Sequence, residues 1–302
     1  MNVTNEEKKQ TISIPVAYAL LAVTVLTWSI GIVIARGVHQ EIPPIGLSFW
    51  RWFVAATILI PFTYTVVFKN IEFIRNNLFY YWQQGFFMAG GGTLLFLAVN
   101  YTTAINVTLV NATQPILTGL VAWIVIRDKL SKYQVLGILS AMIGVSIMVT
   151  RANINTLLNL DFNIGDLIVV IATIFYACYA VNIRRMPKEI GLLPSTFIIV
   201  VMGTVSLLPL YLIEDNFIRP TIFSFKLLIV VIVLALLVSI LSLVMWNTGN
   251  SRVGHNRASI FVNLFPVYSS ILAIIFLGEQ LFLFHIVGAV FVCAGIFLVV
   301  KE

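Results

Sequence analysis

Charged residues are scarce in this sequence and make up only 10% of its 302 positions. Soluble domains carry about 25% charged residues, so the chain has too little polar surface to form a water-soluble enzyme of this size. Cysteine is also rare: only Cys178 and Cys293 occur, and both lie within apolar runs, which excludes a disulfide framework. The net charge of +6 is dispersed over short gaps between apolar segments, so we expect no nucleic acid as a partner.

The sequence also lacks the motifs of covalent, metal and nucleotide chemistry. It contains no Walker lysine motif, no HExxH, no GxSxG and no Cys/His cluster with the spacing of metal ligands. An enzyme working inside the membrane would need a nucleophile or a metal-binding set at membrane depth, and the apolar segments hold neither. We therefore expect no enzymatic activity, no cofactor and no metal.

Long apolar segments dominate the chain. Hydrophobic residues make up 60% of it, and the mean hydropathy is +1.01. A membrane-spanning helix needs roughly 20 mostly apolar residues, and ten segments reach or approach that length. The sequence therefore predicts an all-α membrane protein, with the lipid bilayer as its partner, whose spans lie at about 14–35, 46–68, 78–100, 104–126, 133–150, 165–184, 194–213, 225–247, 256–277 and 282–300.

Lysine and arginine favour cytoplasmic loops, which predicts how the chain is oriented. If the N-terminus is inside, thirteen of the 18 basic residues fall on the cytoplasmic side. Four fall on the outer side: Arg36, Arg151, Arg219 and Lys226. The last, Arg51, begins the second span, where we expect its long stem to reach the headgroups. We expect a structural or gating role for Arg51, with substrate binding as the alternative. The bias places both termini in the cytoplasm, with 1–13 as an N-terminal tail in front of the first span. We also expect the membrane to be the plasma membrane of a bacterium or an archaeon.

The chain resembles itself when it is shifted by 151 residues. Pro115 then meets Pro266 and Asp128 meets Glu279, and a pair of glycines seven residues apart follows in both copies. Chance similarity between hydrophobic helices is the alternative explanation.

If the repeat is real, the chain consists of two five-helix halves, 14–150 and 165–302, joined by an extracytoplasmic linker at 151–164. Because five is odd, the halves must insert in opposite directions. Two inverted five-helix repeats are an architecture of secondary transporters, whose site lies near the midplane between the halves.

Several short stretches carry a resemblance to a known family. They are Leu26-Thr27-Trp28-Ser29, Phe49-Trp50-Arg51-Trp52, the block Asn106…Pro115…Arg127-Asp128-Lys129-Leu130, and its echo Asn256-Arg257-Ala258-Ser259…Pro266…Gly278-Glu279-Gln280-Leu281. On these residues the sequence resembles the EamA-type permeases of the drug/metabolite transporter (DMT) superfamily. The first copy departs from the usual Gly-Glu pair, because it has Arg127-Asp128. The resemblance implies ten helices, a central cavity lined by helices 1, 3, 4, 6, 8 and 9, and outward movement of small polar metabolites, often amino acids.

Polar side chains at membrane depth cost free energy unless they face a cavity or a partner. Two stripes of such residues surround prolines in the fourth and ninth predicted spans: Thr108, Asn111, Gln114 and Thr118 around Pro115, and Ser259, Asn263 and Ser270 around Pro266. We predict that Asn111, Gln114 and Asn263 bind substrate and that Pro115 and Pro266 are hinges, because proline frees a helix carbonyl. The alternative is that the polar residues only bond neighbouring helices.

Aromatic residues deep in the predicted spans form a second candidate group. Trp and Tyr usually lie at membrane interfaces, and a deep indole or phenol needs a partner for its polar tip. We predict that five of them line the substrate path, with ordinary helix packing as the alternative: Trp28, Phe96, Tyr176, Tyr179 and Trp246.

The middle of the predicted spans holds no Asp, Glu or Lys. We therefore predict a largely uncharged cavity and a neutral or zwitterionic small-molecule substrate, such as an amino acid, that is exported by alternating access. A multidrug, nucleoside or sugar carrier of the same fold is the alternative, as is a channel or a structural membrane protein.

Helix ends and glycines support three smaller predictions. Asp128 and Glu279 are expected to cap the helices that follow them or to pair with nearby bases. Gly90-Gly91-Gly92 is expected to serve helix packing, with flexibility or room for a ligand as the alternatives. Gly137 and Gly144 in the fifth span, and Gly288 and Gly295 in the tenth, allow these helices to pack closely, and a homodimer through them is a further expectation.

Overall fold

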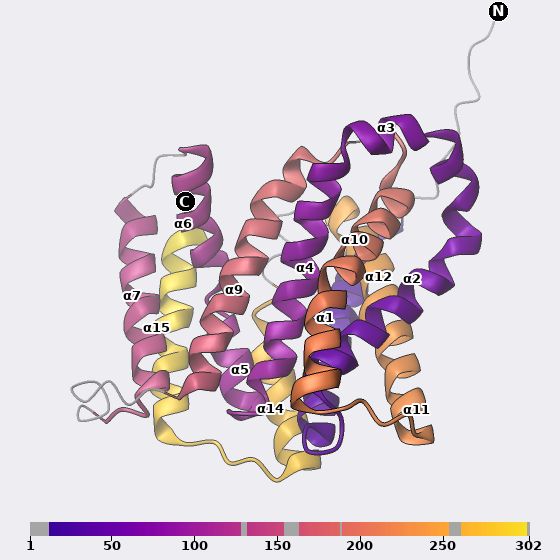
Figure 1. The fold of residues 1–302 in the computed structure, drawn as a ribbon. Coiled ribbons are helices and arrows are strands. Elements are labelled where there is room, and N and C mark those ends of the chain that lie inside the picture. The colour runs from indigo at the N-terminus through magenta and orange to yellow at the C-terminus, as the bar shows by residue number, and fades with distance from the viewer. Residues whose placement is uncertain (1–11, 128–131, 154–162, 188, 254–260, 301–302) are drawn as a thin grey trace, which may run out of the picture.

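The protein is a bundle of helices in the computed structural model (Figure 1), which describes residues 12–127, 132–153, 163–187, 189–253 and 261–300. Every regular element in these ranges is helical. The first half contains α1 (Ile14–Val38), α2 (Pro44–Lys69), the short α3 (Ile71–Asn76), α4 (Leu78–Ala98), α5 (Ala104–Asn111), α6 (Gln114–Ile126) and α7 (Lys132–Val149).

The described residues of the second half, from 163 on, include three irregular helical segments. A 3-10 turn, η1, follows its first helix, and π-helical segments, η2 and η3, end or interrupt two others. The elements are α9 (Ile164–Asn182), η1 (Ile183–Arg185), α10 (Leu192–Ile213), η2 (Glu214–Ile218), α11 (Phe225–Val233), η3 (Leu234–Leu241), α12 (Ser242–Val253), α14 (Leu264–Leu277) and α15 (Leu283–Val300).

Five helices within the described ranges are long and apolar enough to cross a membrane. They are Ile14–Val38, Pro44–Lys69, Ile164–Asn182, Leu192–Ile218 and Phe225–Asn250. A sixth span arises if α5 and α6, which meet at a bend of 42°, are counted as one. Three further apolar helices are shorter: Val135–Met148, Leu264–Leu277 and Leu283–Gly295. The prediction of an all-helical membrane protein is confirmed, whereas the count of ten spans stays a prediction.

Side chains on the outer faces of the bundle are apolar and exposed. Phe62 on α2, Phe79 on α4 and Phe276 on α14 each expose 70% or more of their surface. A soluble monomer rarely shows so much contiguous apolar surface, whereas hydrocarbon solvates it without cost. These faces therefore fit contact with lipid.

At one end of the bundle, hydrogen bonds join the loops that connect the helices. Arg36, in the last turn of α1, donates to the carbonyl of Val99, which follows α4. Asn163, just before α9, donates to the carbonyl of Tyr101. Arg219, after α10, donates to the carbonyl of His39, after α1. We call this end the acidic end, because three buried acids lie there, as described below.

The two halves of the chain begin at opposite ends of the bundle. α1 finishes at the acidic end and so starts at the other one, whereas α9 starts at the acidic end (Figure 1). The described ends of α1 and α15 that lead to the chain termini are both at the end away from it. Residues 1–11 of the predicted tail and 154–162 of the predicted linker lie outside the described ranges.

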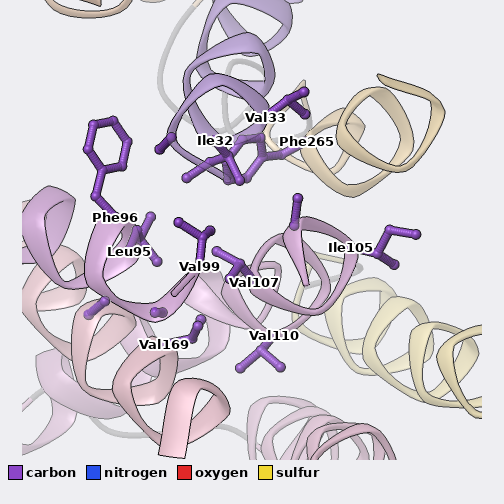
Figure 2. Close-up of a cluster of buried hydrophobic side chains, with 14 of the residues drawn as sticks. Ile32, Val33, Leu95, Phe96, Val99, Ile105, Val107, Val110, Val169 and Phe265 are labelled. Atoms are coloured by element: carbon purple, nitrogen blue, oxygen red, sulfur yellow. The ribbon is translucent and has the colours of Figure 1, made fainter. Parts of the chain in front are cut away.

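A core cluster of apolar side chains joins helices from both halves. Ile32 and Val33 of α1, Phe96 of α4, Val107 of α5 and Phe265 of α14 pack into it (Figure 2). A second cluster ties α2 and α4 to α10 through Phe49, Trp52, Tyr81 and Ile199. α4 contributes to both clusters and packs against α9 and α10 of the second half.

Glycines permit the closest helix contacts. A β-carbon on Gly144 of α7 would lie 2.6 Å from the carbonyl oxygen of Gly288 on α15, and one on Gly295 would lie 2.5 Å from that of Gly137. The predicted close packing of these two helices is confirmed, and it occurs within one chain. Small residues let helix backbones approach in membranes, where dispersion rather than water exclusion drives packing.

Two helices of the described chain end in the same left-handed conformation, 151 residues apart. Gly278 ends α14 with a φ of 67°, and Arg127 ends α6 with a φ of 60°. Glycine adopts this conformation freely, whereas an arginine is strained in it. The first copy thus keeps the backbone turn of the Gly-Glu motif although it has lost the glycine.

Glu279 corrects one prediction. Its carboxylate accepts hydrogen bonds from the backbone N–H groups of Ala104 at 2.8 Å and Ile105 at 3.1 Å, so it caps α5 and not the helix that follows it. The expected pairing with a base is confirmed, because Arg36 lies 3.6 Å away. Sequence separation hides this cap, because α5 is 174 residues upstream. Asp128 lies outside the described ranges.

Candidate functional site

Arg51 is the central charged group of the candidate site. It lies seven residues after the start of α2, which at roughly 1.5 Å per residue is about 10 Å into the bundle from the acidic end. Only 4% of its surface is exposed. The expectation that Arg51 reaches the headgroups is therefore wrong: neighbouring helices cover this face of α2, and the side chain lies among them.

Two aromatic rings cover the Arg51 guanidinium. Its central carbon lies 4.5 Å from the ring centroid of Trp52 and 4.6 Å from that of Phe96. Such cation–π contacts are worth about 0.5–2 kcal/mol each, the larger values applying when the cation is desolvated. Phe96, which was predicted to line the path, contacts Arg51 here, and its place in a substrate path stays a prediction.

Tyr176 and Arg51 converge on Gly92 of α4. A β-carbon on Gly92 would lie 3.1 Å from an Arg51 terminal nitrogen and 3.2 Å from the Tyr176 hydroxyl. A β-carbon on the preceding Gly91 would lie 3.3 Å from the Tyr176 ring. The run of glycines therefore makes room for side chains from α2 and α9, and this part of the site exists because α4 has no side chain there.

Trp28 and Trp246 meet inside the bundle. Their ring centroids are 5.1 Å apart, with the rings tilted by 42°. Trp28 comes from α1 in the first half and Trp246 from α12 in the second. The next residue, Ser29, lies 3.3 Å from the carbonyl of Phe265, directly before Pro266. Trp28 and Ser29 of the first span thus contact two helices of the other half, α12 and α14.

The predicted amides occupy helix breaks. Asn111 ends α5 and is buried, and its side-chain oxygen lies 3.2 Å from the hydroxyl of Thr173 on α9. Gln114 begins α6, and Asn263 directly precedes α14. The side-chain oxygen of Asn263 is buried and has no hydrogen-bond partner in the described chain.

The structure bends the fourth predicted span where proline was expected to act. The helix is interrupted at Ala112 and Thr113, and Pro115 is the second residue of α6. A similar turn at Val262 and Asn263 precedes α14, which contains Pro266. Whether these breaks move as hinges stays a prediction.

Other predicted polar residues have local partners. Thr108 donates to carbonyls of its own helix, and Thr118 donates to the carbonyl of Gln114. Tyr179 packs against the second core cluster. Ser259 lies outside the described ranges. Trp28, Tyr176 and Trp246 pack against the first core cluster, to which Phe96 belongs. All five predicted aromatic residues therefore lie in helix packing, and whether they also line a substrate path stays a prediction.

Three buried acids lie at the acidic end. The sequence predicted a role only for Glu279 and none for Asp166 or Glu214. Asp166 accepts from Thr102 at 2.7 Å and from Asn106 at 3.0 Å. Glu214 accepts from two backbone N–H groups at the start of α2, at 3.2 and 2.6 Å. Glu214 and Glu279 therefore bind the N-termini of α2 and α5, whereas Asp166 binds side chains at the start of α5. Their burial could not be read from hydropathy, because each lies at the edge of an apolar run.

The comparisons with known proteins agree with this architecture. The sequence model of the EamA-like transporter family matches residues 15–150 and 163–301. The uncharacterized transporter YyaM of Bacillus subtilis is 30% identical over 254 residues, which cover 84% of this chain and 83% of the relative. An uncharacterized transporter of Archaeoglobus fulgidus is 23% identical, with 93% and 96% of the two chains covered.

A crystal structure of a protein shares the fold, with a TM-score of 0.58 at 16% sequence identity. The alignment covers 94% of this chain and 96% of that one. At this identity the likeness concerns the fold alone, whereas the family match concerns nearly the whole sequence. The chain therefore belongs to the EamA-like transporter family of the DMT superfamily and is a membrane transporter.

Proposed function

We propose that this protein is a secondary transporter that exports small neutral or zwitterionic metabolites, amino acids or related compounds, by alternating access. The observation that carries the proposal is the contact between Trp28 and Trp246, two deep aromatic residues from different halves of the chain. A site shared by two halves can open to one side or the other when the halves rock against each other.

The architecture that this mechanism needs has independent support. The family model matches two segments of similar length, and the halves begin at opposite ends of the bundle. We propose ten spans arranged as two inverted five-helix repeats, 14–150 and 165–302, with both termini in the cytoplasm of a bacterial or archaeal cell. The acidic end is then the outer end.

Transport itself is tested by counterflow in proteoliposomes. Vesicles containing the purified protein and a high internal concentration of one unlabelled amino acid are given the same labelled compound outside, for each amino acid in turn. A carrier gives saturable uptake that the internal compound stimulates. Uptake that rises linearly and ignores the internal compound would point to a channel instead, and a better response to nucleosides, sugars or drugs would select the alternative substrates.

A variant pair links this flux to the interior site. Trp246→Ala removes one ring of the shared contact, and we expect it to abolish most of the counterflow. Trp123→Ala on α6 is the matched control, because Trp123 is half exposed on the outside of the bundle. If the two variants lose the same amount of counterflow, or if neither loses any, the Trp28–Trp246 contact is not needed for transport.

Orientation is tested with single cysteines in a cysteine-free background. Glu72→Cys places a thiol on the exposed face of α3, and Phe217→Cys places one at the acidic end. We expect a membrane-impermeant maleimide to label intact cells only at position 217. Labelling at position 72 from outside would reverse the proposed orientation.

A homodimer through α7 and α15 also stays a proposal. Their glycine faces already contact each other within the chain, so a dimer would have to use the outer faces. Tyr133, Leu139 and Met142 are exposed there. Cross-linking through Met142→Cys in the membrane would detect such a dimer.

A further inference from the structure

We infer that Arg51 anchors the carboxylate of the substrate, so that this transporter selects small metabolites with a singly charged carboxylate group. The inference rests on the proposed function and adds a substrate class to it. The expected uncharged cavity is thereby revised, because one cation lies in the interior.

The first step is the charge balance around Arg51. Its guanidinium makes no hydrogen bond and no ion pair with any residue of the described chain, and its Nε is buried without a partner. A charge taken out of water without a partner is strongly unfavourable. Arginine cannot relieve this by losing its proton. A ligand that supplies one negative charge would compensate it.

The second step is the geometry of the free donors. The central carbon of the guanidinium lies over the rings of Trp52 and Phe96. No residue of the described chain accepts a hydrogen bond from this guanidinium, so its N–H groups are free to bind a ligand. These N–H groups match a planar carboxylate with two parallel hydrogen bonds. A lone arginine balances one negative charge, which favours a carboxylate over a doubly charged phosphate.

The third step is the convergence of other groups on the same place. The Tyr176 hydroxyl approaches Gly92 beside the Arg51 nitrogen and makes no hydrogen bond within the described residues. It can donate to the same carboxylate. Ser48, one helical turn before Arg51 on α2, also has a buried hydroxyl without a partner. Buried polar atoms without partners call for an explanation, and a polar ligand bound at Arg51 explains those of Arg51 and Ser48.

A purely structural role explains less. The cation–π contact with Phe96 would hold α2 against α4, but a methionine or leucine would fill the same space without a charge to desolvate. A structural arginine would be expected to find an acid, as Arg36 does with Glu279. In the described residues no acid pairs with Arg51.

The test compares acids with their amides in counterflow and in thermal stabilisation of the purified protein. Each amino acid is paired with its amide, and 3-phenylpropionate is paired with 3-phenylpropanamide. We expect the preferred compounds to carry a carboxylate, and amidation to weaken them about tenfold or more, as befits lost hydrogen bonds to a charged group. An uncharged compound that works as well as its acid would overturn the inference.

Variants assign the preference to Arg51. Arg51→Gln should remove the preference for the acid, and Arg51→Lys, which keeps the charge but loses the fork, should retain part of it. Arg75→Gln on α3, at an exposed position, is the matched control and should behave like the wild type. An acid preference that survives in Arg51→Gln would also overturn the inference.

The outcomes separate the inference from the proposed function. If Arg51→Gln does not fold, the comparison of acids with amides on the wild-type protein still tests whether the substrate needs a carboxylate. Saturable counterflow of an uncharged compound with no acid preference would defeat the inference and leave the transporter proposal standing. Absence of saturable counterflow for every acid, amide, nucleoside and sugar would defeat both.

Discussion

Buried charges occupy two regions of this protein, and the two regions treat them differently. At the acidic end, Asp166, Glu214 and Glu279 each accept at least two hydrogen bonds, from side chains or from backbone N–H groups. In the interior, Arg51 is just as buried and donates none within the described chain. The buried acids therefore have hydrogen-bond partners within the described chain, whereas the buried arginine has none.

Helix termini explain why the acids are easily satisfied. The first N–H groups of a helix have no partner inside it and attract negative charge. Glu214 meets the start of α2 and Glu279 the start of α5, in the same two-bond arrangement. Within the described residues, Arg51 meets rings, glycines and the Tyr176 hydroxyl, and none of them accepts a hydrogen bond from it. We therefore expect the acids to serve stability, and we propose Arg51 for binding.

The largest effect is expected from removing a satisfied acid. Glu214→Gln and Glu279→Gln each lose an acceptor for a helix N-terminus in a buried place, which should lower the free energy of unfolding by about 1–3 kcal/mol. Thermal unfolding of the detergent-purified variants measures this. Counterflow per folded molecule should stay near that of the wild type. If the unfolding midpoint stays the same and transport is lost, these acids take part in transport. The proposed difference between structural acids and a binding arginine would then be wrong.

A smaller but more selective effect is expected at Gly92. The added methyl group of Gly92→Ala would press on the Arg51 nitrogen and the Tyr176 hydroxyl, at 3.1 and 3.2 Å. Displacing binding groups by even 1 Å can cost orders of magnitude in rate, and here we expect counterflow to fall about tenfold. The unfolding midpoint should change little.

Gly119→Ala on α6 is the control for this substitution, because a β-carbon there would meet no atom within 4 Å. It removes the same helix-disfavouring glycine without touching the site. If both variants transport equally, the convergence on Gly92 has no functional meaning.

A still smaller effect is expected from the amides at the helix breaks. Asn263→Ala removes an unpartnered buried oxygen and Gln114→Ala removes a side chain at the start of α6. Each should lower counterflow by about threefold to tenfold, the value of one ordinary hydrogen bond to substrate. The amount of protein in the membrane should not change. Wild-type flux in both variants would remove these residues from the site.

The smallest effect is expected from the exposed ion pair at the acidic end. Lys226 and Glu41 lie 2.7 Å apart, but more than half of each side chain is exposed. Exposed pairs contribute about 0–1 kcal/mol, so Lys226→Ala should barely shift the unfolding midpoint. A shift as large as that of Glu214→Gln would show that burial is not what distinguishes the acids.

Sequence patterns predicted the helices well and the site only in part. Apolar length located α1, α2, α9 and α10 within a few residues, and the glycines of α7 and α15 predicted their contact. Trp28, Trp246, Phe96 and Tyr176 were chosen for their depth and do meet other helices inside the bundle. Arg51 was expected to reach the headgroups, but it lies among the helices. Trp52 was quoted only as part of a family motif, and Asp166 was not considered, so the contacts that these two residues make were not predicted.

The sequence by itself determined that this chain is helical, membrane-embedded and a member of its family, because hydrocarbon requires long apolar helices and the motifs recur in order. Only the tertiary structure decided which way each helix faces. In a soluble protein the contrast between core and water marks the buried face, but here the core and the lipid are both apolar, so the pattern leaves rotation about the helix axis open. The contacts of α2 with α4 and of α4 with α9 supply that rotation, and with it the inward direction of Arg51.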